Sequence, residues 1–160
     1  MASFDRDGLS FRYPEEWELS EGSDDAGNVT VHVQSPQTAF WSLTISAGQI
    51  EPNDVFDAVA AALRSEYDAI ELHPGREPAT ISGQQATTCT IEFVVHELPV
   101  ICECGVFAFA DQTVLVMTQY ADVEAEQSET LLDRMTASLR INTLDTAAVV
   151  PEAGLIEDAG

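Results

Sequence analysis

Several segments of this sequence alternate apolar and polar residues with a period of two, and this pattern constrains the fold more than any other feature. Residues 29–34 read Val-Thr-Val-His-Val-Gln, and residues 41–47 read Trp-Ser-Leu-Thr-Ile-Ser-Ala. Successive side chains of a β-strand point to opposite faces, so each segment predicts a strand with one buried face. Residues 9–13 alternate in the same way, and with residues 17–19 across the turn at 14–16 they predict a hairpin.

Two segments change to the spacing of an amphipathic helix. Residues 52–67 begin with a proline, which suits a first helical turn, and residues 123–139 follow Asp122, a favourable N-cap residue. Apolar residues three and four positions apart share one face of a helix. The two apolar stripes are Val55, Phe56, Val59, Leu63 and Tyr67 in the first segment, and Leu131, Leu132, Met135 and Leu139 in the second.

The order of these elements predicts the fold class. Further strands are expected at residues 69–73, 79–82, 85–95, 100–108 and 113–120. Strands joined by short turns usually pair antiparallel. We therefore expect residues 1–141 to form one α+β domain, a single antiparallel β-sheet with two amphipathic helices packed on it in αβα-type layers. Residues 142–160 hold few large apolar residues, and we expect an acidic, disordered C-terminal tail there.

The chain is very acidic. It contains 28 Asp and Glu residues against 6 basic residues, all of them Arg, and its net charge is −22 at pH 7. Dissolved salt screens the self-repulsion of such a surface, while the apolar content of 45% is that of an ordinary globular protein. This combination predicts adaptation to high salt and a halophilic source; an acidic mesophile protein is the alternative. Scattered Arg residues form no basic track, which excludes nucleic acid and anionic membranes as partners.

The sequence also predicts a cytoplasmic location. No run of residues approaches the ~18 apolar residues that a membrane-spanning helix requires. The N-terminal residues have neither the basic nor the apolar region of a signal peptide. The number of cysteines is 3, and an odd number argues against a disulfide framework and for a reducing compartment.

The N-terminal motif suggests a family. Residues 8–17, Gly-Leu-Ser-Phe-Arg-Tyr-Pro-Glu-Glu-Trp, resemble the G-x-x-F-x-Y-P-x-x-W start of PsbP-like (Mog-like) domains. A helix after the fourth strand, a hairpin around Gly83 and a late strand at 114–118 follow in the same order, so the resemblance covers residues 4–141. It implies an α+β fold and protein binding without catalysis, because such domains include an extrinsic photosystem subunit, a regulator of the Ran GTPase, bacterial lipoproteins and chaperone-like adaptors. It implies no site residue, since none is attached to the matched motif.

Cys89, His96, Cys102 and Cys104 are the best candidates for metal chemistry. Thiolates and imidazole are zinc ligands, and pairing of the strands around the turn at 96–99 would place the cysteines on one face of the sheet. Their neighbours on that face are apolar, however, no Cys-x-x-Cys motif occurs, and buried free cysteine is common core material. Core packing is the favoured interpretation, and a metal site is the alternative.

Four other residues have two interpretations each. Glu92 and Glu103 fall on the strand face opposite the cysteines, where they either line a functional surface or are simply solvated. Phe40 and Trp41 point to opposite faces, so one of them either marks a binding patch or packs at the sheet edge. The favoured interpretations are solvation and packing.

No pattern in the sequence indicates catalysis. There is no Gly-x-Ser-x-Gly elbow and no glycine-rich phosphate loop. We therefore predict no catalytic, cofactor-binding or metal-ligating residues, no cofactor, and a non-catalytic binding or adaptor domain with a protein partner that the sequence does not identify. A homodimer is compatible with this hypothesis. The alternative function is a small metal-binding protein or enzyme that uses the Cys89, His96, Cys102 and Cys104 region.

The charge leads to a first prediction. Raising the salt concentration from roughly 0.1 M to above 1 M shortens the screening length to a few ångströms and weakens the repulsion between carboxylates. We expect the melting temperature to rise across this range in thermal melts followed by circular dichroism. A flat or falling melting temperature would contradict adaptation to salt.

Overall fold

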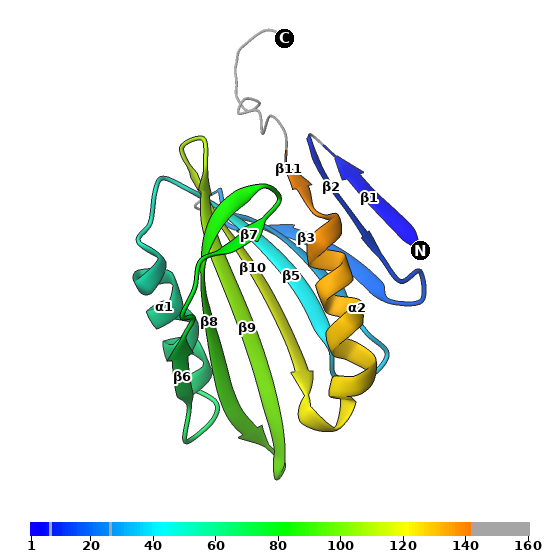
Figure 1. Ribbon diagram of the computed structural model, residues 1–160, viewed down its shortest axis with the longest axis vertical. Coiled ribbons are helices and arrows are strands. Elements are labelled where there is room, and N and C mark those ends of the chain that lie inside the picture. Colours follow the sequence, from blue (N-terminus) through cyan, green and yellow to red (C-terminus); the bar gives the residue numbers. More distant parts are fainter. Residues whose placement is uncertain (7, 26, 142–160) are drawn as a thin grey trace, which may run out of the picture.

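The strands form two antiparallel sheets in a computed structural model that describes residues 1–6, 8–25 and 27–141 (Figure 1). Within this described part, a 3-stranded sheet has the order β1-β2-β11. An 8-stranded sheet has the order β3-β4-β5-β10-β9-β8-β6, with β7 paired to β8 outside this path. The tail expected at 142–160 lies outside the described residues.

The elements follow the predicted order of strands, helix, strands and helix, and the short strand β11 is added after the second helix. The strands before the first helix are β1 (Ala2–Arg6), β2 (Leu9–Tyr13), β3 (Glu18–Ser23), β4 (Val29–Gln34) and β5 (Phe40–Ala47). The helices are α1 (Pro52–Arg64) and α2 (Ala125–Ser138), the latter preceded by the 3-10 turn η1 (Asp122–Glu124). The remaining strands are β6 (Glu71–Pro74), β7 (Ala79–Ile81), β8 (Gln84–Val95), β9 (Leu98–Phe109), β10 (Gln112–Ala121) and β11 (Arg140–Ile141).

The prediction of a single sheet was wrong, because β2 and β3 do not form a hairpin. The backbone amide of Trp17 donates to the carbonyl oxygen of Pro14 in a turn, after which β3 joins the larger sheet beside β4. Strand β2 pairs instead with β1 and with β11 near the end of the described chain. Alternation indicates which side chains are buried, but it does not indicate which strand supplies the backbone hydrogen-bond partners.

Both predicted helices are present, with altered ends. The first ends at Arg64 rather than Tyr67, although the Tyr67 ring still stacks on Phe93 at 4.9 Å between ring centroids. The prediction that Asp122 caps the second helix was wrong, since Asp122 begins η1 and the N-cap residue of α2 is Glu124, without a side-chain cap. Among the described residues, neither helix has the length and the apolar content that a membrane span needs.

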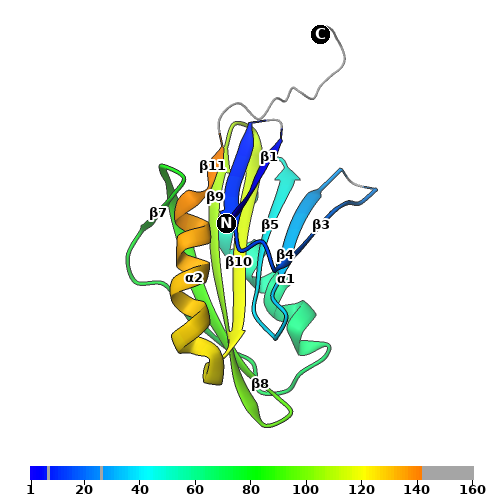
Figure 2. The same cartoon turned by 90° about the vertical axis from the view of Figure 1, so that its right-hand side faces the viewer.

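The helices lie on opposite faces of the larger sheet (Figure 2). We call these faces the α1 face, which includes Cys102 and Ile91, and the α2 face, which includes Leu43 and Val116. Helix α1 contacts β8 and β9, whereas α2 contacts β5, β10 and the smaller sheet through β2. Each helix therefore covers a different half of the sheet.

Two cores result from this arrangement. The first joins α2 and the smaller sheet to the α2 face, and its largest fully buried side chains are Trp41, Phe11, Leu43, Leu132, Met135 and Leu139. The second lies under α1 and consists of Phe56, Cys89, Ile91, Phe93, Val100, Cys102, Cys104 and Val106. Because the cores are offset, β8 and β9 carry polar side chains on the α2 face at Thr88, Thr90 and Glu103, while Ala86 and Phe107 on the same face still belong to the first core.

Aromatic packing joins the two sheets and α2. The Phe11 ring of β2 lies 4.4 Å from the Trp41 ring of β5 and 5.1 Å from the Phe4 ring of β1, measured between centroids. The Trp41 indole Nε1 donates to Thr136 Oγ1 of α2 at 3.0 Å. Phe11 and Trp41 are almost completely buried, so removing either side chain leaves a cavity at this junction.

The junction gives a second prediction. Replacing Phe11 by alanine should lower the free energy of unfolding by about 3–5 kcal/mol, the usual cost of truncating a buried phenylalanine. Denaturant unfolding at constant salt measures the loss. The control is Val123→Ala, because the Val123 side chain is 69% exposed and its truncation should cost little. Equal stability of the two variants would contradict the packing described here.

Candidate binding groove

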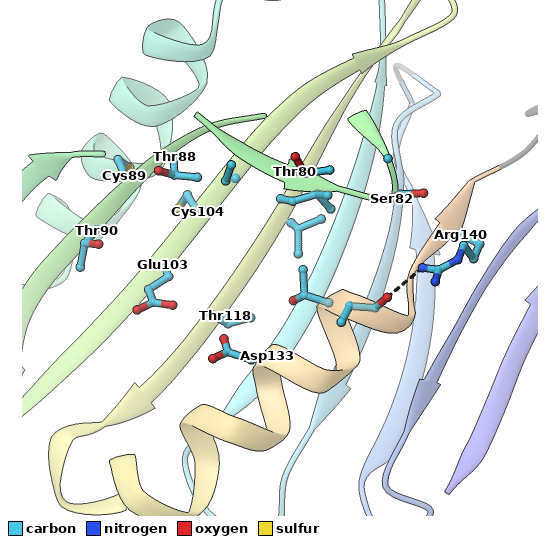
Figure 3. Close-up of a pocket in the computed structure, with 17 residues that line it drawn as sticks. Thr80, Ser82, Thr88, Cys89, Thr90, Glu103, Cys104, Thr118, Asp133 and Arg140 are labelled. Carbon is cyan, nitrogen blue, oxygen red and sulfur yellow. Dashed lines mark hydrogen bonds between the residues drawn. The ribbon is translucent and has the colours of Figure 1, made fainter. Parts of the chain in front are cut away.

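An open groove of about 960 Å³ lies on the α2 face, between α2 and the β7–β8 hairpin (Figure 3). Its floor is formed by β8, β9 and β10, one wall by α2 with the start of β11, and the other by β7 and the following turn. The residues that line the groove include Ile81, Thr88, Thr90, Glu103, Val116, Thr118, Asp133, Ala137 and Arg140.

Strand alternation determines which side chains face the groove. Thr90, Glu103 and Thr118 are paired across neighbouring strands, and they point to the same face because directly opposed residues share a side of the sheet. The strand positions next to Glu103 are Cys102 and Cys104, whose side chains point to the α1 face. The groove floor is polar because the apolar positions of these strands are used by the core under α1.

Gly105 allows the β7 wall to approach the sheet. A Cβ atom at Gly105 would lie 2.6 Å from Ile81 Cδ1, which is closer than packed carbon atoms can come. The hairpin from β7 to β8 turns through Ser82 and Gly83, both with positive φ, as a two-residue turn of type I′ requires. The glycine in β9 therefore lets Ile81 lie against the floor and close this end of the groove.

Carboxylates from two elements meet in the groove. Figure 3 shows the Glu103 side chain of β9 and the Asp133 side chain of α2 directed toward the same space. Burial raises the pKa of Glu103, and the charges of Asp133 and Glu129 raise it further. Burial followed by the charge of Glu129 raises the pKa of Asp133, and burial followed by the charge of Glu103 raises the pKa of Tyr120 to about 12. The groove thus has an excess of negative charge.

Arg140 stands at the other end of the groove, and its guanidinium is already engaged. Its Nη1 donates to the carbonyl oxygens of Ala137 and Leu139, both at 2.8 Å. These contacts satisfy carbonyl groups that the end of α2 leaves without helical partners. Among the described residues, no basic side chain forms an ion pair with Glu103 or Asp133.

The structure separates the residues of the sequence-predicted metal site. Cys89 and Cys104 are paired across β8 and β9, and all three cysteines are free and buried in the core under α1. His96 is exposed in the turn that joins these strands, with φ of 51°. It is seven positions from Cys89, roughly 20 Å along an extended strand.

The surroundings of the thiols favour their protonated form. A hydrogen bond to Cys104 and burial raise the pKa of the Cys89 thiol, and a hydrogen bond to Cys102 raises that of Cys104. Metal ligation and nucleophilic attack both require the thiolate. These cysteines are packed as core residues, which is the interpretation that the sequence favoured.

The four other residues with two interpretations lie in different environments. Glu103 lies in the groove, whereas Glu92 is exposed near the sheet edge, both on the face opposite the cysteines as predicted. Trp41 is core, and Phe40 is partly buried on the other face with its ring 4.8 Å from that of His32. Asp133 was not predicted from the sequence. The apolar stripe of a helix shows which face is buried, but it does not show which residue of the polar face lies over a sheet.

Comparison with solved structures identifies the fold. The solution structure of cyanobacterial PsbP (CyanoP) from Synechocystis sp. PCC 6803 matches with a TM-score of 0.61 at 15% identity, covering 88% of this chain and 92% of that chain. A Pseudomonas aeruginosa protein of unknown function matches with a TM-score of 0.52 at 11% identity, covering 89% and 97%. No family model and no curated protein matches the sequence. The likeness shows the fold alone, and it confirms the predicted PsbP-like fold.

The raised pKa of Glu103 gives a third prediction. A raised pKa means that the folded state holds the proton more tightly than the unfolded state, so stability is lost as pH rises above the ordinary glutamate value of about 4.3. Glu103→Gln should therefore raise the melting temperature near neutral pH and lose this advantage in acid. The matched control is Glu15→Gln, which removes one carboxylate from an exposed turn. The same gain for both variants at every pH would contradict the cause assigned here.

Proposed function

We propose that this protein is a non-catalytic binding domain that holds a basic segment of a partner protein in the groove between α2 and the β7–β8 hairpin. The observation that carries the proposal is the pair Glu103 and Asp133, which point into the groove, repel each other and have no basic partner among the described residues. A lysine or arginine side chain between them would replace that repulsion with two charge-assisted hydrogen bonds.

The remaining lining suits a peptide segment. Ile81, Val116 and Ala137 offer apolar surface, while Thr88, Thr90 and Thr118 offer hydroxyl groups that both donate and accept hydrogen bonds. The volume of about 960 Å³ is enough for several side chains. Because the groove is partly shielded from solvent, its ion pairs are screened by salt less than ion pairs on an open surface.

We further propose that the protein is adapted to high salt and located in the cytoplasm. The net charge of −22 without lysine supports the first. The free state of all three cysteines supports the second, because reducing compartments maintain thiols. A protein partner is favoured over the alternative metal or catalytic function of the cysteine region, because those thiols are buried and His96 lies apart from them.

Peptide titration tests the proposal and forms a fourth prediction. Short capped peptides with one central arginine, and matched peptides with glutamate in its place, are titrated into labelled protein at constant molar salt and followed by NMR. We expect the arginine peptides to shift backbone resonances of residues around Thr88, Glu103 and Asp133, and the glutamate peptides to leave them unchanged.

Two variants and one control make the result specific. Glu103→Gln and Asp133→Asn should each weaken arginine-peptide binding about tenfold, the usual effect of losing one charged partner in a shielded site. Glu15→Gln removes the same charge outside the groove and should leave the affinity unchanged. Arginine-peptide binding that maps elsewhere, or that depends equally on Glu15, would exclude the groove as the basic-segment site.

A further inference from the structure

A second group of polar side chains lies outside the groove, where edge strand β6 pairs with β8. Glu71 and His73 are two positions apart on β6, so their side chains share a face, and Glu92 of β8 lies on the same face. His73 Nε2 is 3.5 Å from Glu71 Oε1 and 3.8 Å from Glu92 Oε1. One ligand atom from each of the three residues lies within 4.8 Å of the other two.

The register of the strands holds these side chains together. Glu71 is directly opposite Glu92, and the neighbouring pair is Leu72 opposite Ile91, whose side chains point to the other face and pack in the core under α1. Ile91 is fully buried, and Leu72 is packed against the same core. A slip of β6 by one residue would expose Leu72, so apolar packing on one face fixes the ligand positions on the other.

The charges at this position are unfavourable without a cation. Two carboxylates directly opposite each other across a strand pair are destabilising. Within the described residues, His73 is the basic side chain that lies within 4.0 Å of Glu71 or Glu92. A divalent ion bound by the imidazole and both carboxylates would balance the charges of the two glutamates.

We propose that Glu71, His73 and Glu92 form a surface site for a divalent transition metal ion, with Zn²⁺ as the best match. In a tetrahedral zinc site with ligand distances of about 2.0–2.2 Å, ligand atoms are roughly 3.3–3.6 Å apart. The separations of 3.5 Å and 3.8 Å from His73 Nε2 are close to this spacing, and glutamate side chains can adjust by rotation. Imidazole and carboxylate are both zinc ligands, and the exposed side leaves a fourth position for water.

This site is separate from the cysteines and from the groove carboxylates. Cys89 pairs with Pro74 at the next position of β6, but its side chain points into the core under α1. Thr90 of β8 is paired with His73 of β6 on one side and with Glu103 of β9 on the other, so it separates the two sites. Metal binding at β6 therefore needs neither a thiolate nor the proposed peptide groove.

Isothermal titration of the metal-free full chain with ZnCl₂, in chelator-free buffer at molar salt, measures the binding. We expect one Zn²⁺ per chain. His73→Asn and Glu92→Gln should each lower the affinity by about tenfold or more, the scale of losing a group that supports a metal site. His96→Asn is the matched control, because His96 is an exposed histidine in a turn with positive φ, which asparagine tolerates.

A second measurement distinguishes the intended ligands from the thiols. Co²⁺ bound by Glu71, His73 and Glu92 should give visible absorption without the intense near-ultraviolet sulfur-to-metal charge-transfer band of thiolate coordination. The proposal is overturned by absence of Zn²⁺ binding, by a charge-transfer band in the Co²⁺ spectrum, or by equal affinities of the wild type, His73→Asn and Glu92→Gln. Circular dichroism confirms that each variant is folded before titration.

Discussion

The two apolar layers of this structure are offset from each other, and this offset determines where the sheet can carry polar side chains. The large sheet is covered on one face by α1 over β8 and β9, and on the other by α2 and the smaller sheet over β5 and β10. Where a strand is covered on only one face, it supplies apolar side chains to that face and is free to carry polar side chains on the other. The groove and the Glu71, His73 and Glu92 cluster both occupy the uncovered half of the α2 face.

The sequence predicted the elements better than their partners. Alternation located most strands, and helical spacing located both helices, because burial of one face imposes a period that local residues display. Alternation over residues 9–13 predicts a half-buried strand, but the contact of Phe11 with Trp41 across two sheets depends on which strands pair over long distances. Strand β1 was missed because it has a single buried residue, Phe4, and so no repeated period.

The candidate sites were predicted only as far as the local alternation of strand residues determines them. The sequence placed Glu92 and Glu103 opposite the cysteines, and the strand register confirms this. The sequence did not predict that Asp133 lies near Glu103 or that His73 lies near Glu92, because each pair joins elements whose relative position follows from tertiary packing. The three cysteines are possible metal ligands by their chemistry alone. Their positions on the apolar side of the strands make them core residues instead; they are Cys89, Cys102 and Cys104.

Glu103 and Asp133 form a shielded, negatively charged pair that we propose binds a cation, and NMR titration of their side-chain carboxyl carbons is the sharpest test of this proposal. Both carboxyl groups of the free protein should titrate above the usual range for Glu and Asp. A bound arginine peptide should move both midpoints down, because a nearby cation favours the ionised form. Ordinary midpoints in the free protein that the peptide leaves unmoved would show that the pair is not a cation site.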